Sequence, residues 1–190
     1  MILGRRLLAL SLAAAALVAI AGTEAMAQTA TPIDIQAKLF LKICSYDENL
    51  PADLLRVGVA YPSADGETGS QITGTFRSLE KMKVNGRRIE AVAVAYAKPA
   101  DIAAAVKALA LYGLFVTAAA SPADIAAVRD LAKKHHVFTF GQDDRFVAAG
   151  LTAGIATEGE KRVILLNMTA ALEQGRKYDG NFIKACKVVR

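Results

Sequence analysis

Short runs of apolar residues recur along the chain, separated by longer segments in which apolar residues return every three or four positions. The runs cover residues 54–61, 88–96, 114–117 and 137–140. Runs this short, bounded by proline, glycine and polar residues, are typical of buried strands, and the segments between them are typical of amphipathic helices. Alternation of strand and helix predicts a parallel sheet with helices on both faces.

The helical segments carry recognisable boundaries. Residues 32–46 and 72–82 show helical spacing, and a loop with two glycines is expected over residues 63–70. The sequence Pro-Ala-Asp-Ile-Ala-Ala occurs twice, at residues 99–104 and 122–127. Proline fits the first turn of a helix because its missing N–H has no helical partner there, and an acid complements the positive helix end. Both copies therefore predict helix starts.

The last quarter of the chain has a different pattern. The apolar runs 152–156 and 162–166 are joined by Thr-Glu-Gly-Glu, which predicts an antiparallel hairpin. A helix or turn is expected at 143–149, and helices are expected at 168–175 and 181–189. The expected fold is a three-layer α/β/α domain whose sheet is mostly parallel and ends in this hairpin.

The amino terminus has the pattern of a secretory signal peptide. Arg5 and Arg6 precede an apolar run at residues 7–20, and Ala-Met-Ala at 25–27 forms a small-residue cleavage site. The apolar run is too short to cross a bilayer comfortably. We therefore expect residues 1–27 to be removed and residues 28–190 to form one domain in the periplasm.

Composition and charge exclude some classes of function. The chain is 54% hydrophobic and 22% charged, as in globular proteins, and its net charge is +5. The lysines and arginines are scattered, whereas nucleic-acid binding requires a clustered basic face. We expect no nucleic-acid partner.

No arrangement of residues indicates catalysis. The two histidines, His135 and His136, are adjacent, whereas metal ligands on a helix lie three or four positions apart. They are better placed to end the helix before residue 137. Asp143 and Asp144 are also neighbours and suit a helix start rather than paired acid–base chemistry. We expect no enzyme activity, no metal and no cofactor.

Some residues are candidates for contact with a ligand or partner. Loops that follow parallel strands form crevices in open sheets, which favours the segments 61–70 and 141–145. Asn167 follows the last strand and is expected to cap a helix. An apolar residue of the first helix is a candidate for contact with a partner. The candidate residues are Phe40, Gly66, Gly69, Asp143, Asp144 and Asn167.

Cys44 and Cys186 are the only cysteines. An even count in an oxidising compartment allows a disulfide, which requires the first and last helices to pack together. The alternative is two separate buried thiols. The sequence leaves both open.

Several segments, in their order, resemble the YfiR-like family. The resemblance covers nearly the whole chain after residue 27, and no single motif in it is specific. It starts with Leu39-Phe40 and Arg56-Val57-Gly58-Val59. The later segments are 84–89 (Val-Asn-Gly-Arg-Arg-Ile), 137–141 and 146–150, the strand and asparagine of 162–167, Ala-Ala-Leu at 170–172, and the apolar end at 182–189.

The resemblance implies a non-catalytic periplasmic regulator. Such a protein binds the periplasmic sensor region of a membrane-bound diguanylate cyclase and represses it, so that cyclic-di-GMP and biofilm formation respond to the cell envelope. Repression of this kind requires tighter binding to one conformation of the cyclase than to the other. A homodimer is compatible with this function. The alternative is a periplasmic protein that binds a small-molecule solute.

Overall fold

The computed structural model describes residues 31–159 and 161–189. The expected signal peptide, residues 1–27, lies outside the described residues. No helix in the described ranges is long and apolar enough to cross a membrane.

The strands are β1 (Leu54–Pro62), β2 (Lys83–Val84), β3 (Arg87–Tyr96), β4 (Gly113–Val116), β5 (Phe138–Gly141), β6 (Ala153–Glu158), β7 (Lys161–Asn167) and β8 (Lys187–Val189). The helices are α1 (Ile33–Cys44), the 3-10 turn η1 (Ser63–Asp65), α2 (Gly66–Ser78), α3 (Pro99–Leu109), α4 (Pro122–His135), α5 (Asp144–Ala148), α6 (Met168–Glu173) and α7 (Gly180–Ala185).

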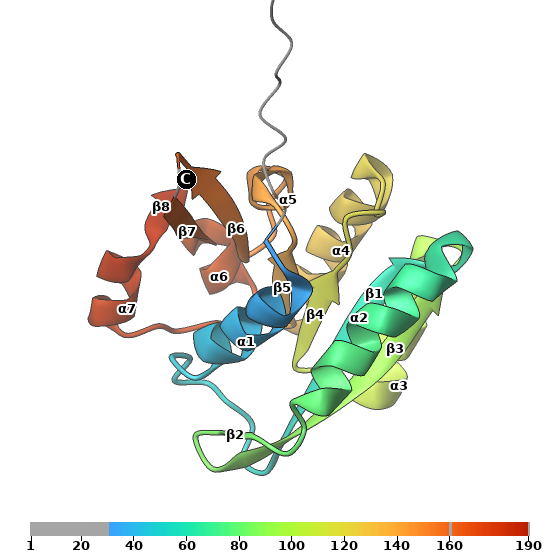
Figure 1. The fold of residues 1–190 in the computed structure, drawn as a ribbon, viewed down its shortest axis with the longest axis horizontal. Coiled ribbons are helices and arrows are strands. Elements are labelled where there is room, and N and C mark those ends of the chain that lie inside the picture. Colours follow the sequence, from blue (N-terminus) through green and yellow to red (C-terminus); the bar gives the residue numbers. More distant parts are fainter. Residues whose placement is uncertain (1–30, 160, 190) are drawn as a thin grey trace, which may run out of the picture. The chain divides into compact units, whose positions relative to one another are not determined.

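The strands form one eight-stranded sheet in the order β2-β3-β1-β4-β5-β6-β7-β8 (Figure 1). Strands β3, β1, β4, β5 and β6 are parallel. Strand β2 is antiparallel to β3 at one edge, and β7 returns antiparallel to β6 before β8 adds at the other edge. The predicted fold class, a mostly parallel sheet with a carboxyl-terminal antiparallel hairpin, is therefore confirmed.

Each face of the sheet has its own apolar core. On one face, α1 and α2 pack over β1, β4 and β5, and Figure 1 shows these two helices in front of the strands. On the other face, residues of α3, α4 and α5 form a second cluster with β3 and β4. Because the central strands are covered on both sides, their sequences are continuous apolar runs rather than alternating ones.

Phe40 is a core residue, so its predicted contact with a partner is wrong. Its side chain is fully buried, and its ring lies 5.1–6.3 Å, centroid to centroid, from those of Phe76, Phe115, Phe138 and Phe140. Edge-to-face and offset contacts of this kind stabilise aromatic clusters beyond the area that they bury. This cluster holds α1 and α2 on the sheet.

The two repeated Pro-Ala-Asp sequences start helices, as predicted. Helix α3 begins at Pro99 and α4 begins at Pro122. The Asp101 carboxylate accepts the N–H groups of Ala97 and Lys98 at 3.0 and 3.1 Å, and these hydrogen bonds lower its pKa. In α4 the corresponding acid exchanges hydrogen bonds with the capping serine before it. The acid thus satisfies N–H groups that would otherwise lack partners.

The loop predicted over residues 63–70 is wrong in its second half. Helix α2 begins at Gly66, after one 3-10 turn. Its glycines suggested a loop, but Gly69 is needed for packing: a Cβ at this position would lie 2.1 Å from the Tyr61 ring. The missing side chain therefore lets α2 pack directly on the end of β1.

The last segment differs from the expected helix over residues 181–189. Helix α7 ends at Ala185, and the backbone of Cys186 is extended, with φ −100° and ψ 153°. The residues after it pair with β7 in a parallel ladder that includes Leu166 with Val188. Adjacent valines favour extended structure, and the open edge of β7 supplies the hydrogen-bonding partner.

Cys44 and Cys186 are free thiols in the structure. Cys44 is fully buried, and burial raises the pKa of its thiol well above the usual range. Cys186 is half-buried, and burial raises its pKa to about 11. Both thiols therefore stay protonated, and poorly nucleophilic, near neutral pH.

The glycines of α2 give a test of this packing. We expect Gly69→Ala to lower the free energy of unfolding by about 1–3 kcal/mol, because the new methyl group overlaps the Tyr61 ring. Gly66→Ala is the matched control, since nothing lies within 4 Å of its added Cβ, and it should leave stability unchanged or raise it by less than about 1 kcal/mol. Urea unfolding of both variants measures the difference. Equal effects would contradict the proposed contact.

The free thiols give a second test. We expect the native protein to react slowly with Ellman's reagent at pH 8. The protein unfolded in guanidinium without reductant should show two reactive thiols per chain, because both cysteines are free. Cys186→Ser should reduce this to one. Because only the thiolate reacts, alkylation of native Cys186 should accelerate as the pH rises toward about 11. Failure to detect thiols in the unfolded, unreduced protein would instead show a disulfide.

Candidate functional site

The carboxyl ends of the parallel strands meet along one edge of the sheet. Strand β1 lies between β3 and β4. After β1 the chain adds β3 on one side of it and then crosses to add β4 on the other side, so the direction in which strands are added changes at β1. Helix α2, which follows β1, packs on one face, whereas α4, which follows β4, packs on the other. The loops after β1 and β4 therefore diverge, and open α/β sheets bind ligands at such switch points.

Two short exposed segments flank this switch point. After β1, Ser63 and Ala64 are exposed in the turn η1. After β4, Ala118 and Ala119 are exposed before the helix cap at Ser121. Small side chains on both segments leave the backbone accessible to a small molecule.

Thr117 lies at the root of the second segment. Its backbone N–H donates to the carbonyl of Ala60 on β1 at 3.1 Å, and its own carbonyl accepts from Ala120 at 3.1 Å. Its side chain is buried, with 1% exposed, yet Oγ1 has no hydrogen-bond partner among the described residues. A buried hydroxyl without a partner is uncommon in proteins and calls for a partner that the chain does not supply.

Another buried hydroxyl lies at the end of β3, the other neighbour of β1. Tyr96 is 3% exposed, and its hydroxyl lies beside the Asp124 carboxylate without a hydrogen bond of good geometry. Burial, then the negative charge of Asp124 and the interaction of its carboxylate with the hydroxyl, raise the pKa of Tyr96 well above its usual value. The hydroxyl therefore remains a neutral donor at all ordinary pH values.

The loop after β5 is fastened to the segment that carries Thr117. The Ala118 N–H donates to Oε1 of Gln142 at 2.5 Å, and the Ala118 carbonyl accepts from the Arg145 guanidinium. Arg145 also pairs with the Asp143 carboxylate at 3.2 Å. Both polar groups of the Ala118 backbone are thus occupied, which fixes the position of the loop after β4.

The structure does not bring the six sequence-predicted residues into one site. Asp143 caps α5 by accepting the N–H of Arg145 at 3.1 Å, and Asn167 caps α6 by accepting that of Ala170 at 2.9 Å, as expected for helix starts. Gly66 and Gly69 belong to α2, and Phe40 belongs to the core described above. Asp144 lines a depression of the surface together with other residues of α5 and with residues of β6, β7 and β8.

That depression has a volume of about 590 Å³ and lies where α5 stops covering the sheet. Its apolar wall includes Leu165 and Val189 from β7 and β8. Arg145 is paired with Asp143 and Lys187 with Glu158, whereas Asp144 makes no ion pair within the described residues. None of the buried polar atoms that lack a hydrogen-bond partner in the described residues belongs to this lining, in contrast to the switch point.

The histidines act as the sequence analysis expected. His136 ends α4 in the left-handed conformation, with φ 52°, and its N–H donates to the carbonyl of Ala132. Within residues 31–159 and 161–189, no group of three or more His, Cys, Asp or Glu side chains is placed to hold a metal ion.

The sequence does not single out the residues of the switch point, because each of them ends a predicted strand: Thr117 ends the run 114–117, and Tyr96 ends the run 88–96. Both positions end an apolar run that precedes a Pro-Ala-Asp helix start, and this recurrence was the available signal. What the sequence does not show is that neither hydroxyl finds a partner.

Comparison with known proteins finds similar folds among solved structures. No family model and no curated protein matches the sequence. Solved structures that are similar include a conserved domain protein of Vibrio cholerae (15% identity, TM-score 0.59) and an ABC domain from a pneumococcal Streptococcus in complex with L-Trp (12%, 0.57). A ligand-free, open substrate-binding protein with adhesive properties from Clostridium difficile is also similar (12%, 0.60). Each match covers 84% of this chain, which spans 60% of the length of each of these proteins. At such identities the likeness shows that the chain shares their fold.

Proposed function

We propose that this protein is an exported, non-catalytic receptor that binds a small polar organic molecule at the switch point between β1 and β4. The observation that carries the proposal is the buried Thr117 hydroxyl, which has no partner within the described residues. A bound carboxylate or carbonyl oxygen would accept its hydrogen bond.

The energetics favour a role for this hydroxyl in binding. An unsatisfied buried polar group costs about 1–3 kcal/mol in the free protein. A ligand that satisfies it recovers this free energy on binding, and an analogue without an acceptor does not. The Tyr96 hydroxyl, on the other neighbour of β1, differs from it because the Asp124 carboxylate lies beside it, so the proposal rests on Thr117.

The similar structures indicate which ligands to try first. One was solved in complex with L-Trp, and another is a substrate-binding protein. An amino acid fits the chemistry of the edge, because its carboxylate accepts from hydroxyls and its ammonium donates to exposed backbone carbonyls. We therefore propose free amino acids, aromatic ones included, as the first class of ligand.

A thermal-shift screen tests the proposal. Because a ligand stabilises the folded state by mass action, a cognate amino acid at about 100 times its Kd should add about 2.7 kcal/mol to the free energy of unfolding. We expect Thr117→Val to remove most of this shift while leaving the free protein as stable or more stable, because the methyl group replaces an unsatisfied hydroxyl.

The control is Thr75→Val on the outer side of α2, where the hydroxyl is exposed. This variant should keep the full ligand-induced shift. If no amino acid or small polar acid stabilises the protein, or if Thr117→Val binds as tightly as the parent, the receptor function at this edge is wrong.

A second candidate function comes from the YfiR-like resemblance. The observation that favours it is the order of elements after residue 160, which is strand β7, the capping Asn167 and then helices α6 and α7. The final apolar segment departs from that pattern, because its helix ends at Ala185 and strand β8 follows. In this proposal the protein represses a membrane-bound diguanylate cyclase from the periplasm by binding one conformation of its sensor region.

Cellular cyclic-di-GMP distinguishes this candidate. We expect deletion of the gene to raise cyclic-di-GMP, and complementation with the parent gene to restore the lower level. A complementing Thr117→Val gene separates the two functions, since repression that needs no ligand would survive the substitution. An unchanged level on deletion, under conditions in which the protein is produced, would exclude the repressor function.

A further inference from the structure

A groove runs between α1 and the β2–β3 hairpin, with a volume of about 290 Å³. The hairpin is tied to the end of α1, because the Asn85 side-chain amide donates to the carbonyl of Ser45 at 2.7 Å. Strand β2 pairs with the first residues of β3. The groove therefore lies near the amino ends of the parallel strands, at the opposite end of β3 from Tyr96.

The floor of the groove is apolar. Leu41 of α1, Val84 of β2 and Ile89 of β3 line it, each no more than 5% exposed. Met82 stands at its side with 47% of its surface exposed, one of the few large apolar residues left in contact with water. Methionine is flexible and polarisable, so it adapts to the shape of a bound side chain.

The rim of the groove is positively charged. Lys38, Lys42 and Lys83 line it, and no acidic residue does. Lys38 pairs with Asp34 at 3.2 Å, on the exposed side of α1. Within residues 31–159 and 161–189, neither Lys42 nor Lys83 makes an ion pair, although the Lys42 ammonium lies 4.8 Å from the centre of the Tyr46 ring. The site thus combines an apolar floor with two lysines that no carboxylate of the described residues pairs with.

We propose that this groove, which we call the lysine groove, binds an acidic segment of a partner protein that carries one bulky apolar side chain. The apolar side chain enters over Leu41 and Ile89 beside Met82, and carboxylates on either side of it pair with Lys42 and Lys83. Charge complementarity sets the class of partner, and burial of the apolar side chain supplies most of the affinity.

The shape favours a protein segment over a lipid surface. A concavity of about 290 Å³ accommodates one large side chain, whereas membrane binding relies on apolar groups that protrude from the surface. Strand β2 is also the end of the sheet, and its outer side pairs with no strand of the described residues. An extended segment is the usual ligand of such an edge.

Methionine-methyl NMR on the full chain tests the proposal. The probe is a synthetic eight-residue peptide with a central Leu-Phe flanked by glutamates; its comparison peptides replace Leu-Phe by Ser-Ser, or the glutamates by lysines. The Met82 methyl signal is assigned by its loss in Met82→Leu. We expect only the first peptide to shift this signal, and we expect the shift to become smaller as the salt concentration rises. Lys42→Glu with Lys83→Glu should weaken binding by about tenfold or more.

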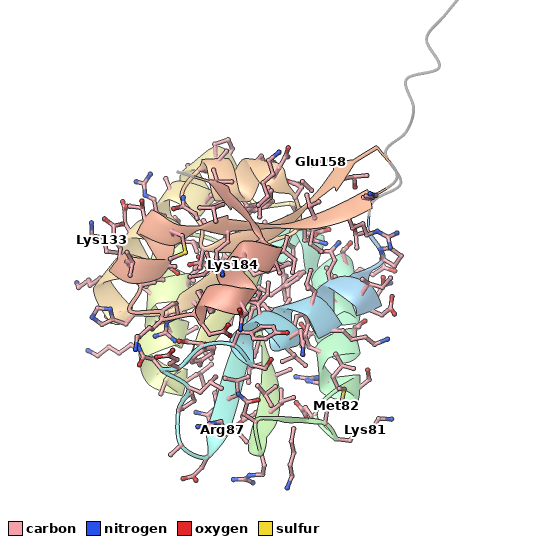
Figure 2. All side chains as sticks on the ribbon, turned by 90° about the vertical axis from the view of Figure 1, so that its left-hand side faces the viewer. Lys81, Met82, Arg87, Lys133, Glu158 and Lys184 are labelled. Carbon is pink, nitrogen blue, oxygen red and sulfur yellow. The ribbon has the colours of Figure 1, made fainter. Side chains whose placement is uncertain are left out.

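The matched control reverses the charge of two exposed lysines outside the groove, Lys107→Glu with Lys184→Glu. This double variant should bind the peptide as tightly as the parent protein does. Figure 2 shows Lys184 on a different part of the surface from Met82 and Lys81. Equal weakening by both double variants, or no response of Met82 to the acidic peptide, would overturn the proposal. So would a response to phosphatidylglycerol vesicles without one to the peptide. Binding here is independent of the Thr117 site, so Thr117→Val should leave it unchanged.

Discussion

The described domain depends on one buried carboxylate. The Asp47 side chain is fully buried, and its Oδ2 accepts from the Tyr112 hydroxyl at 2.6 Å and from the Arg176 guanidinium at 3.0 Å. Its Oδ1 accepts the backbone N–H groups of Asn49 and Lys177 at 2.9 and 3.1 Å. A buried charge is tolerated only when it is paired and fully hydrogen-bonded, and losing one partner of such a pair costs about 3–5 kcal/mol. This arrangement joins the end of α1, the start of β4 and the segment between α6 and α7, and so fixes the carboxyl-terminal hairpin region against the aromatic core.

This arrangement also explains how the two surfaces that we propose for binding remain separate. Arg176 donates to the carbonyl of His136 at 2.9 Å, and its guanidinium lies 4.9 Å from the centre of the Tyr112 ring, so the amino ends of β4 and β5 are rigidly held. At the other end of these strands, Gln142 and Arg145 hold the loop after β4. Thr117 lies at the carboxyl end of β4, whereas the outer side of α1 forms one wall of the lysine groove near the amino ends of the strands.

The fold class and most elements could be predicted because their signals are local, whereas the order of the strands in the sheet was not predicted. Apolar runs covered on both faces mark β1, β3, β4 and β5, and proline with an acid marks α3 and α4.

The errors arose where a tertiary contact decides the structure. Gly69 is helical because the Tyr61 ring occupies the space of a side chain, and Val188 is extended because β7 offers an open edge. Phe40 was a candidate for contact with a partner only as an apolar residue of the first helix, and only the packed structure shows that it faces the sheet. For Thr117, the sequence gives the position at the edge but not the absence of a partner.

The pairing of Asp47 with Arg176 also bears on when the chain is able to fold. The two residues are 129 positions apart. A chain that emerges with its amino terminus first exposes Asp47 long before Arg176 exists, so this buried ion pair forms only after nearly the whole chain has been made. Until then, burial of Asp47 lacks its charged partner and is disfavoured. A contact that is completed late suits passage across a membrane before folding, which the proposed export would involve.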